Sequence, residues 1–176
     1  MTLRIPYIIA AVIAAMSIVY LASPPGLRAA PVLTVTSLDG EQFNLAATNG
    51  KTRLVTFMSP DCPVTNKNLP VIDQVQQHYS DNTIEVVGIT MPYDSVNDVH
   101  EYRDARNIRF KLVADTDGKI ADAFAQVRFT PTSFLIDGQG NIKQRIVGRL
   151  RTDELQQQID SLTVQRSFAQ HQPSTR

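Results

Sequence analysis

The sequence predicts an α/β domain in which a central mixed β-sheet is flanked by helices. Short apolar runs of strand length, at residues 53–58, 84–90 and 130–137, alternate with segments such as 63–79 that carry an apolar stripe at helical spacing. The predicted order is hairpin, strand, helix, strand, helix, hairpin, helix. This order combines helix-linked with turn-linked strands, which is typical of a mixed sheet between helices.

The composition is that of one globular domain with appendages. The chain has 176 residues, of which 43% are hydrophobic and 19% charged, so it is neither disordered nor collagen-like. Its 17 basic and 17 acidic residues cancel, which argues against a nucleic-acid partner. A single cysteine excludes an intrachain disulfide and a multi-cysteine zinc site, and we expect no metal and no cofactor.

Residues 1–30 are predicted to be a signal peptide or an N-terminal membrane anchor. Residues 5–22 form an apolar run near the lower limit of about 17–25 residues for a spanning helix, and Ser23 opens a helix-breaking Ser-Pro-Pro-Gly. Arg4 stands before the run and favours a cytoplasmic amino terminus. The remaining chain would then lie on the periplasmic side of the inner membrane, tethered by the N-terminal helix, or be secreted to the periplasm after cleavage.

The exported part is predicted to begin with a β-hairpin, because residues 32–38 and 42–45 alternate around the turn Asp39–Gly40. Residues 31–163 form the expected domain, and residues 164–176 are a predicted flexible tail. The later elements are expected in this order: strand 53–58, helix 63–79, strand 84–90, a helix capped by Ser95 and ending near Asn107, a short extended piece 110–113, helix 119–126, strands 130–137 and 141–147, and a final helix from the N-cap Thr152 to near Leu162.

The candidate reactive group is Cys62, which lies between a buried strand and a helix. Cys62 is predicted to be the N-cap of that helix, with Pro63 as its first residue. The free amides of the first turn and the helix dipole then favour the thiolate. Thr65 can donate its hydroxyl to the sulfur, whereas the carboxylate of Asp61 opposes ionisation. We predict a moderately activated thiol; the alternative is a buried, inert cysteine.

The stretch 54–65, together with Pro70, resembles the active-site strand and kinked helix of the thioredoxin-like superfamily. It is most similar to the membrane-tethered TlpA-like, or redoxin, branch related to AhpC/TSA proteins. Residues 95–107 and 129–138 resemble that branch as well, so the resemblance spans nearly the whole exported part. It implies a thioredoxin-like fold in which Pro131 is cis and lies against Cys62. It also implies that Thr130 offers its backbone to a bound peptide or thiol substrate.

The sequence departs from the C-x-x-C motif of that family. The motif here is Cys62-Pro63-Val64-Thr65, so Thr65 stands where the resolving cysteine belongs. A two-cysteine reductase cycle is therefore unavailable within this chain. After Cys62 attacks a substrate disulfide, release requires an external thiol such as glutathione or a partner's cysteine.

Three functions remain open. The first is an exported monothiol thiol–disulfide oxidoreductase that exchanges with protein or small-molecule thiols and disulfides. Its catalytic residues would be Cys62 and Thr65, its substrate-binding residues Thr130 and Pro131, and its supporting residues Pro63 and Ser59. The second is a one-cysteine peroxiredoxin-like peroxidase, and the third is a non-catalytic thioredoxin-fold binding module.

The peroxidase interpretation depends on the peroxiredoxin motif P-x-x-x-[TS]-x-x-C. Ser59 fits its hydroxyl position, but Val55 replaces its proline. Its activating arginine has no clear counterpart, and Arg128 or Arg149 could serve only if the fold brings them close.

Other polar residues receive structural interpretations. His78 and His100 lie in predicted helices, and we expect them at the surface. Residues 115–118, Asp-Thr-Asp-Gly, resemble the start of a calcium loop but lack its distal glutamate, so they are predicted to form a turn and a helix cap.

Overall fold

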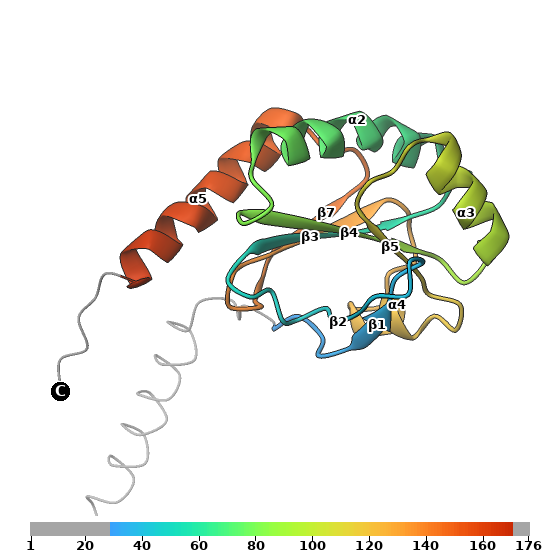
Figure 1. Cartoon of the computed structure of the whole chain (residues 1–176), viewed down its shortest axis with the longest axis horizontal. Helices are drawn as coiled ribbons and strands as arrows, with labels where there is room; N and C mark the ends of the chain where they lie inside the picture. Colours follow the sequence, from blue (N-terminus) through green and yellow to red (C-terminus); the bar gives the residue numbers. More distant parts are fainter. Residues whose placement is uncertain (1–28, 171–176) are drawn as a thin grey trace, which may run out of the picture.

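A five-stranded sheet forms the centre of the molecule (Figure 1). The structure is a computed structural model and describes residues 29–170, with side chains as far as residue 163. The strands lie in the order β5-β4-β3-β6-β7. β3, β4 and β5 are parallel, whereas β6 is antiparallel to β3 and to β7, so the predicted mixed sheet is confirmed. The bounds are β3 Thr52–Met58, β4 Ile84–Thr90, β5 Lys111–Ala114, β6 Thr132–Ile136 and β7 Ile142–Val147.

Helices cover one face of this sheet, and a hairpin with a short helix covers the other (Figure 1). The first face carries α2 (Pro63–His78), α3 (Val96–Ala105) and α5 (Thr152–Gln170). The second face carries β1 (Thr34–Thr36), β2 (Gln42–Asn44) and α4 (Lys119–Ala123). β1 pairs antiparallel with β2, as the turn at Asp39–Gly40 predicts.

The central strand β3 supplies both cores because its side chains alternate between the two faces. Leu54 and Met58 pack in the core beneath α2 and α5, whereas Val55 and Phe57 pack in the core on the hairpin side. All seven residues of β3 are buried, which confirms the predicted central strand. The sheet therefore holds the carboxyl end of β3 firmly, and the candidate thiol follows that end directly.

Two helix boundaries differ from the prediction. α4 ends at Ala123 rather than near Gln126, because Ala125 and Gln126 take positive φ angles of 60° and 54°. α5 has Thr152 as its first helical residue rather than its N-cap, and it continues past the predicted end near Leu162 to Gln170. No glycine or proline interrupts residues 152–170, so polar composition alone does not end the helix.

The turn before α4 confirms the cap predicted there. The carboxylate of Asp115 is buried and accepts hydrogen bonds from the amides of Ile120 at 3.0 Å and Ala121 at 2.8 Å. These amides belong to the first turn of α4 and would otherwise lack acceptors. Asp115 is therefore a structural residue.

The described chain is paired with the sheet from its first residues. Ala29 forms a bridge with Asn141, and the buried Ala30 donates its amide to the carbonyl of Gly140 at 2.7 Å. The predicted signal peptide or anchor falls on residues 1–28, which lie outside the described residues, as do residues 171–176 of the predicted tail. Within residues 29–170, no helix combines the length and the apolar character needed to cross a membrane.

Candidate active site

Cys62 lies where β3 passes into α2, on a corner of the sheet. It is the N-cap of α2, with extended backbone angles of φ −83° and ψ 115°, and Pro63 is the first helical residue. Both placements were predicted from the sequence. The thiol is partly exposed, so the alternative of a sealed, inert cysteine is wrong. A reagent or substrate can therefore reach the sulfur.

The first turn of α2 favours the ionised form of Cys62. Burial by itself would raise the pKa of the thiol, but the polar groups of Thr65, from its backbone and side chain, and the backbone amide of Val64 lower it by more. A weaker contribution comes from the side chain of Thr130, and the net result is a lowered pKa. The amides at a helix N-terminus point toward an N-cap side chain and stabilise negative charge there. The direction of this shift agrees with the predicted activation of the thiol, which stays a prediction.

The fold brings the segment around Pro131 against the thiol, although the two are far apart in the sequence. The Sγ of Cys62 donates to the carbonyl oxygen of Thr130 at 3.4 Å, and the Thr130–Pro131 peptide bond is cis. Pro131 is buried at the start of β6, and Thr130 is partly exposed. The cis bond and the contact with Cys62 both agree with the expectation from the resemblance. The thiol is thus bordered by the carbonyl group of Thr130, a residue that is itself partly exposed.

Ser59, the hydroxyl candidate of the peroxidase interpretation, is held by residues of two neighbouring segments. Its side chain is buried, and its hydroxyl donates to Oδ1 of Asp94 at 2.7 Å. Its amide donates to Oγ1 of Thr65 at 3.5 Å, so Ser59 supports the residue that stabilises the thiolate. The other carboxylate oxygen of Asp94 accepts from the amide of Met91 at 2.9 Å. Ser59 therefore connects the segment between β3 and Cys62 to the loop between β4 and α3.

Asn66 and Tyr102, which were not predicted, stabilise the turn at residues 60–62. The side-chain amide of Asn66 donates to the carbonyl oxygens of Pro60 at 3.2 Å and Cys62 at 3.3 Å. Its Oδ1 accepts from the hydroxyl of Tyr102, on α3, at 2.9 Å. Burial raises the pKa of Tyr102 to about 12, with Arg106 lowering it and the negative charge of Cys62 raising it, so the phenol remains a donor at neutral pH.

Asn68 is another residue that the sequence reasoning missed. It lies on the apolar stripe of α2 and is buried, with its side chain bonded to the loop after β7. A signal existed, because Asn68 precedes Ile72 by four residues and therefore interrupts an apolar face with an amide. A polar residue on such a face requires a specific partner, and the sequence alone does not identify it.

The charged candidates named from the sequence are not identified as partners of the thiol. Arg128 and Arg149 are exposed, and neither is among the leading groups that shift the pKa of Cys62. His78 is the last residue of α2, at the opposite end from Cys62, and its ring packs edge-on against Tyr79 with centroids 4.8 Å apart. His100 is partly exposed on α3. Neither His78 nor His100 is therefore identified as a partner of the thiol.

Three exposed apolar side chains are neighbours, in sequence or in strand pairing, of Asp94, Thr130 and Thr132. Tyr93, directly before Asp94, is 66% exposed, and Phe129, directly before Thr130, is 71% exposed. Val147, which pairs with Thr132 across β6 and β7, is 60% exposed. Apolar groups of this size in solvent favour contact with a partner molecule.

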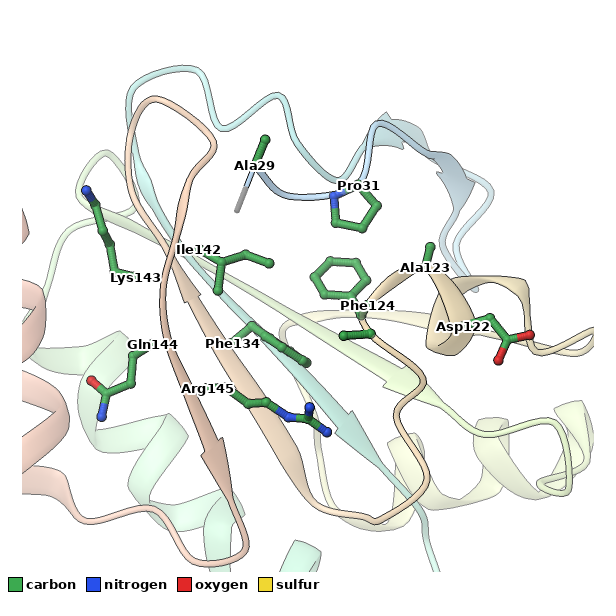
Figure 2. Close-up of a pocket in the computed structure, with 11 residues that line it drawn as sticks. Ala29, Pro31, Asp122, Ala123, Phe124, Phe134, Ile142, Lys143, Gln144 and Arg145 are labelled. Carbon is green, nitrogen blue, oxygen red and sulfur yellow. The ribbon is translucent and has the colours of Figure 1, made fainter. Parts of the chain in front are cut away.

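A hollow of about 390 Å³ lies on the hairpin side of the sheet (Figure 2). Its floor is formed by Phe124 and Phe134, and its walls include Pro31, Ile142 and Arg145. The guanidinium of Arg145 lies 5.5 Å from the ring centre of Phe134. Cys62 does not line it, so the hollow is separate from the candidate active site.

Comparison with known proteins identifies the family of this arrangement. A model of the AhpC/TSA family matches residues 27–145 of the chain. The thioredoxin-like protein YneN of Bacillus subtilis is 27% identical over 132 residues, covering 74% of this chain and 76% of YneN. The thiol-disulfide oxidoreductase ResA of Geobacillus thermodenitrificans is 23% identical over 133 residues, covering 76% and 75% of the two chains.

Solved structures show the same fold. A putative thioredoxin from Neisseria meningitidis superposes with a TM-score of 0.70 at 28% identity, covering 76% of this chain and 89% of the other. A secreted disulfide oxidoreductase of Mycobacterium tuberculosis superposes with a TM-score of 0.64 at 25% identity, covering 74% and 96%. The thioredoxin-like α/β fold expected from the sequence is confirmed.

Proposed function

The chain belongs to the AhpC/TSA family, and from this premise we propose that it is an exported thiol–disulfide oxidoreductase in which Cys62 is the nucleophile and an external thiol releases the product. The observation that carries the proposal is the geometry of the thiol. Cys62 is partly exposed, has a lowered pKa, and lies 3.4 Å from the carbonyl oxygen of Thr130 beside Pro131. The relatives named as oxidoreductases support the same reaction class.

The reaction is a pair of thiol–disulfide exchanges. In the first, the thiolate of Cys62 attacks one sulfur of a substrate disulfide, a Cys62–substrate disulfide forms, and the other sulfur leaves as a thiolate that takes up a proton. In the second, the thiolate of an external thiol attacks the substrate sulfur of that mixed disulfide. The Cys62 thiolate is then released, and a disulfide between the substrate and the external thiol is formed. Electrons come from the external thiol, so no further reductant is needed.

Thr65 determines that this second step is intermolecular. It occupies the position of the resolving cysteine, and the chain has no other cysteine that could take its place. Its backbone amide and hydroxyl instead stabilise the Cys62 thiolate, which is both the attacking group of the first step and the leaving group of the second. Thr65 therefore supports both half-reactions without exchanging a sulfur.

The substrate class that we propose is a protein or peptide disulfide, with a small thiol such as glutathione as the external reductant. Thr130 is a partly exposed residue whose carbonyl oxygen lies next to the sulfur, and this position suits the binding of an extended substrate segment. Tyr93, directly before Asp94, and Phe129, directly before Thr130, add exposed aromatic surface. Apolar contacts of this kind supply affinity without requiring one particular substrate sequence.

Export of the domain is part of the proposal. Residues 5–22 form an apolar run preceded by Arg4, which is the pattern of a signal or anchor segment. One similar solved structure is described as secreted. In an oxidising compartment, a single accessible thiol that is not used in exchange would be a liability, so its retention supports a redox role.

The peroxidase alternative finds less support in the geometry. Its hydroxyl residue would be Ser59, but that hydroxyl donates to Asp94. Its arginine would be Arg128 or Arg149, and neither is among the leading groups that shift the pKa of Cys62. Neither the Ser59 hydroxyl nor the two arginines are thus identified, among the described residues, as a donor to a peroxide bound at the sulfur.

The test is exchange with a defined mixed disulfide. We expect the full-length chain, purified in detergent, to release glutathione from a glutathionylated peptide and to accumulate a disulfide at Cys62 that added glutathione removes. Cys62→Ser should abolish both signals, while Ser161→Ala, on the exposed surface of α5, should leave them unchanged. Wild-type protein that exchanges no faster than Cys62→Ser would contradict the proposal.

A second experiment identifies the physiological partner. Covalent adducts of Cys62 can be isolated from the cell envelope and the attached molecule identified by mass spectrometry. We expect peptide or glutathione adducts. The absence of any adduct under oxidising and reducing conditions would favour the non-catalytic binding module.

A further inference from the structure

The side-chain amide of Asn68 occupies a position that packing alone does not explain. Asn68 is 2% exposed and lies on the face of α2 that packs against the sheet and α5. A buried amide costs free energy unless both of its ends are hydrogen-bonded, and an apolar residue of similar size would fill the same space. Both ends of Asn68 are in fact bonded, and both partners belong to the same loop.

That loop joins β7 to α5. The Nδ2 of Asn68 donates to the carbonyl oxygen of Gly148 at 3.0 Å, and its Oδ1 accepts from the amide of Leu150 at 3.0 Å. Gly148 has a φ of 91°, which is strained for residues other than glycine, so the loop turns sharply at this point. One side chain thereby fixes two backbone groups on either side of Arg149.

The same loop holds the segment that borders the thiol. The amide of Gly148 donates to the carbonyl oxygen of Pro131 at 2.8 Å, and Thr130, the residue before Pro131, accepts from Cys62. A closed circuit results, which runs from Cys62 along α2 to Asn68, across to Gly148, on to Pro131 and Thr130, and back to the sulfur. Asn68 is the point at which the helix that carries the thiol is bonded to the loop that supports the substrate-binding segment.

We propose that Asn68 is a positioning residue for thiol–disulfide exchange. Its amide sets the distance and orientation of the Thr130–Pro131 segment relative to Cys62, through Gly148. The inference rests on the proposed function, because only a reaction at Cys62 with a substrate bound along Thr130 requires the Thr130–Pro131 segment to keep a fixed position relative to the sulfur. Reacting groups must be held within about 0.5 Å of the productive geometry, and misplacement by about 1 Å can cost 10²-fold in rate.

The inference separates two reactions of the same sulfur. A small alkylating reagent such as iodoacetamide meets only the thiolate, whose pKa depends mainly on burial and on Thr65 and Val64. A peptide disulfide must in addition lie along Thr130. Loss of the Asn68 amide should therefore impair exchange with the peptide much more than alkylation.

The experiment compares Asn68→Ala with Tyr79→Phe in the full-length chain. Tyr79, beside the far end of α2, donates to the carbonyl oxygen of Gln156 at 3.0 Å and to Asp160 at 2.7 Å, so its variant loosens the contact between α2 and α5 without touching the loop at Gly148. For Asn68→Ala we expect exchange with a glutathionylated peptide to fall about tenfold or more, while alkylation at the same pH changes less than about twofold. Tyr79→Phe should leave both rates unchanged.

Hydrogen exchange supplies an independent readout, because Asn68→Ala should speed exchange of the Leu150 and Gly148 amides and Tyr79→Phe should not. If Asn68→Ala does not fold, Asn68→Asp replaces it, since it keeps the size and the acceptor for Leu150 and loses the donor to Gly148. If Asn68→Ala lowers the melting temperature but leaves thiol–disulfide exchange by the folded protein unchanged, the inference is overturned. Equal losses in the rates of thiol–disulfide exchange and of alkylation would overturn it as well. If the wild type itself exchanges no faster than Cys62→Ser, the proposed function fails instead.

Discussion

Ser59 donates its hydroxyl to Oδ1 of Asp94 at 2.7 Å, across 35 residues of sequence. This bond joins the loop that precedes Cys62 to the loop that precedes α3. It also directs the hydroxyl toward a carboxylate rather than toward a peroxide at the sulfur.

We expect hydrogen peroxide to oxidise Cys62 slowly, because the hydroxyl that a peroxidase would use is bonded to Asp94. Ser59→Ala should change the rate of sulfenic acid formation less than about twofold, while the loss of a hydrogen bond to a carboxylate should cost about 1.5–3 kcal/mol of stability. Trapping of sulfenic acid with dimedone, followed over time, measures the rate. Rapid stoichiometric oxidation of the wild type would place the peroxidase function first.

The rate of alkylation of Cys62 should depend on pH with a midpoint below the value of about 8.5 for a free cysteine. Burial raises the pKa of this thiol, but Thr65 and Val64 outweigh burial. Thr65→Val should move the midpoint upward only in part, because it removes the hydroxyl and leaves both amides. Iodoacetamide kinetics between pH 5 and 10 test this, and a wild-type midpoint at or above the free value would contradict it.

The same pKa shift has a consequence for stability. Because the pKa is lower in the folded state, the thiolate stabilises the fold above the pKa of the unfolded thiol, and this contribution is lost as the pH falls through the folded pKa. The stability difference between the wild type and Cys62→Ser should therefore increase with pH. Urea titrations at several pH values measure it, and a difference that is constant with pH would argue against ionisation.

Thr65→Cys should convert the site into a dithiol. Thr65 lies in the first turn of α2, three residues after Cys62, and its side chain contributes to the lowered pKa of the thiol, so we expect a cysteine there to attack the mixed disulfide from within the chain. Intramolecular attack has a large advantage over attack by a free thiol, and we expect reduction of insulin disulfides to rise by about tenfold or more. Thr65→Ser is the control, since it keeps a hydroxyl and adds no thiol. No gain from Thr65→Cys would show that the geometry at position 65 is wrong for resolution.

The parts of this site that the sequence predicted are those with local signals. Pro63 after Cys62 and the apolar run of β3 before it locate the N-cap, because helix starts and buried strands depend on residues a few positions apart. Pro131 was located through its resemblance to a family motif. The order of the strands and helices followed from periodicity in the same way.

The contacts that hold the site together had no local signal. Ser59 and Asp94 are 35 residues apart and Asn68 and Gly148 are 80 apart, so their pairing depends on the completed fold. The early end of α4 depends on Ala125 in a left-handed conformation that alanine seldom adopts. Arg53 begins the apolar run 53–58, and its burial could not be predicted because its partners come from other segments of the chain.

Arg53 should be a main determinant of stability at the hairpin. It is 3% exposed and donates from Nε to Oε2 of Glu85 at 2.8 Å and from its terminal nitrogens to the carbonyl oxygens of Asn44 and Ala47. Arg53→Met should lower the free energy of unfolding by about 3 kcal/mol, the lower part of the range for one partner of a buried ion pair, because Lys111 still neutralises Glu85 at 3.0 Å. Chemical denaturation measures the loss.

Lys119→Ala is the matched control for Arg53→Met, because the pair of Lys119 with Asp117 is exposed to solvent and should contribute little to stability. The Arg53 pair should also depend on pH. Burial raises the pKa of Glu85, but Arg53 and Lys111 outweigh burial and lower it, so its contribution is present above the unfolded pKa of about 4.3 and is lost as the pH falls through the folded value. Equal losses in the two variants would show that burial of the Arg53 pair is unimportant.

Thr90→Val should stabilise the protein, although it lies in the central sheet directly beside Met58, the last residue of β3. Thr90 is fully buried, and its Oγ1 has no hydrogen-bond partner among the described residues. Valine has the same shape and the same preference for strands, so the change removes an unsatisfied hydroxyl without opening a cavity. We expect a gain of about 1 kcal/mol.

Thr56→Val provides the opposite case. Oγ1 of Thr56 accepts from the buried hydroxyl of Ser133 at 2.9 Å. Its removal leaves that donor unpaired and should cost about 1–3 kcal/mol. Thermal melts of both variants decide the matter: opposite signs support hydrogen-bond satisfaction as the cause, whereas a loss in both would show that the hydroxyl of Thr90 contributes to stability in another way.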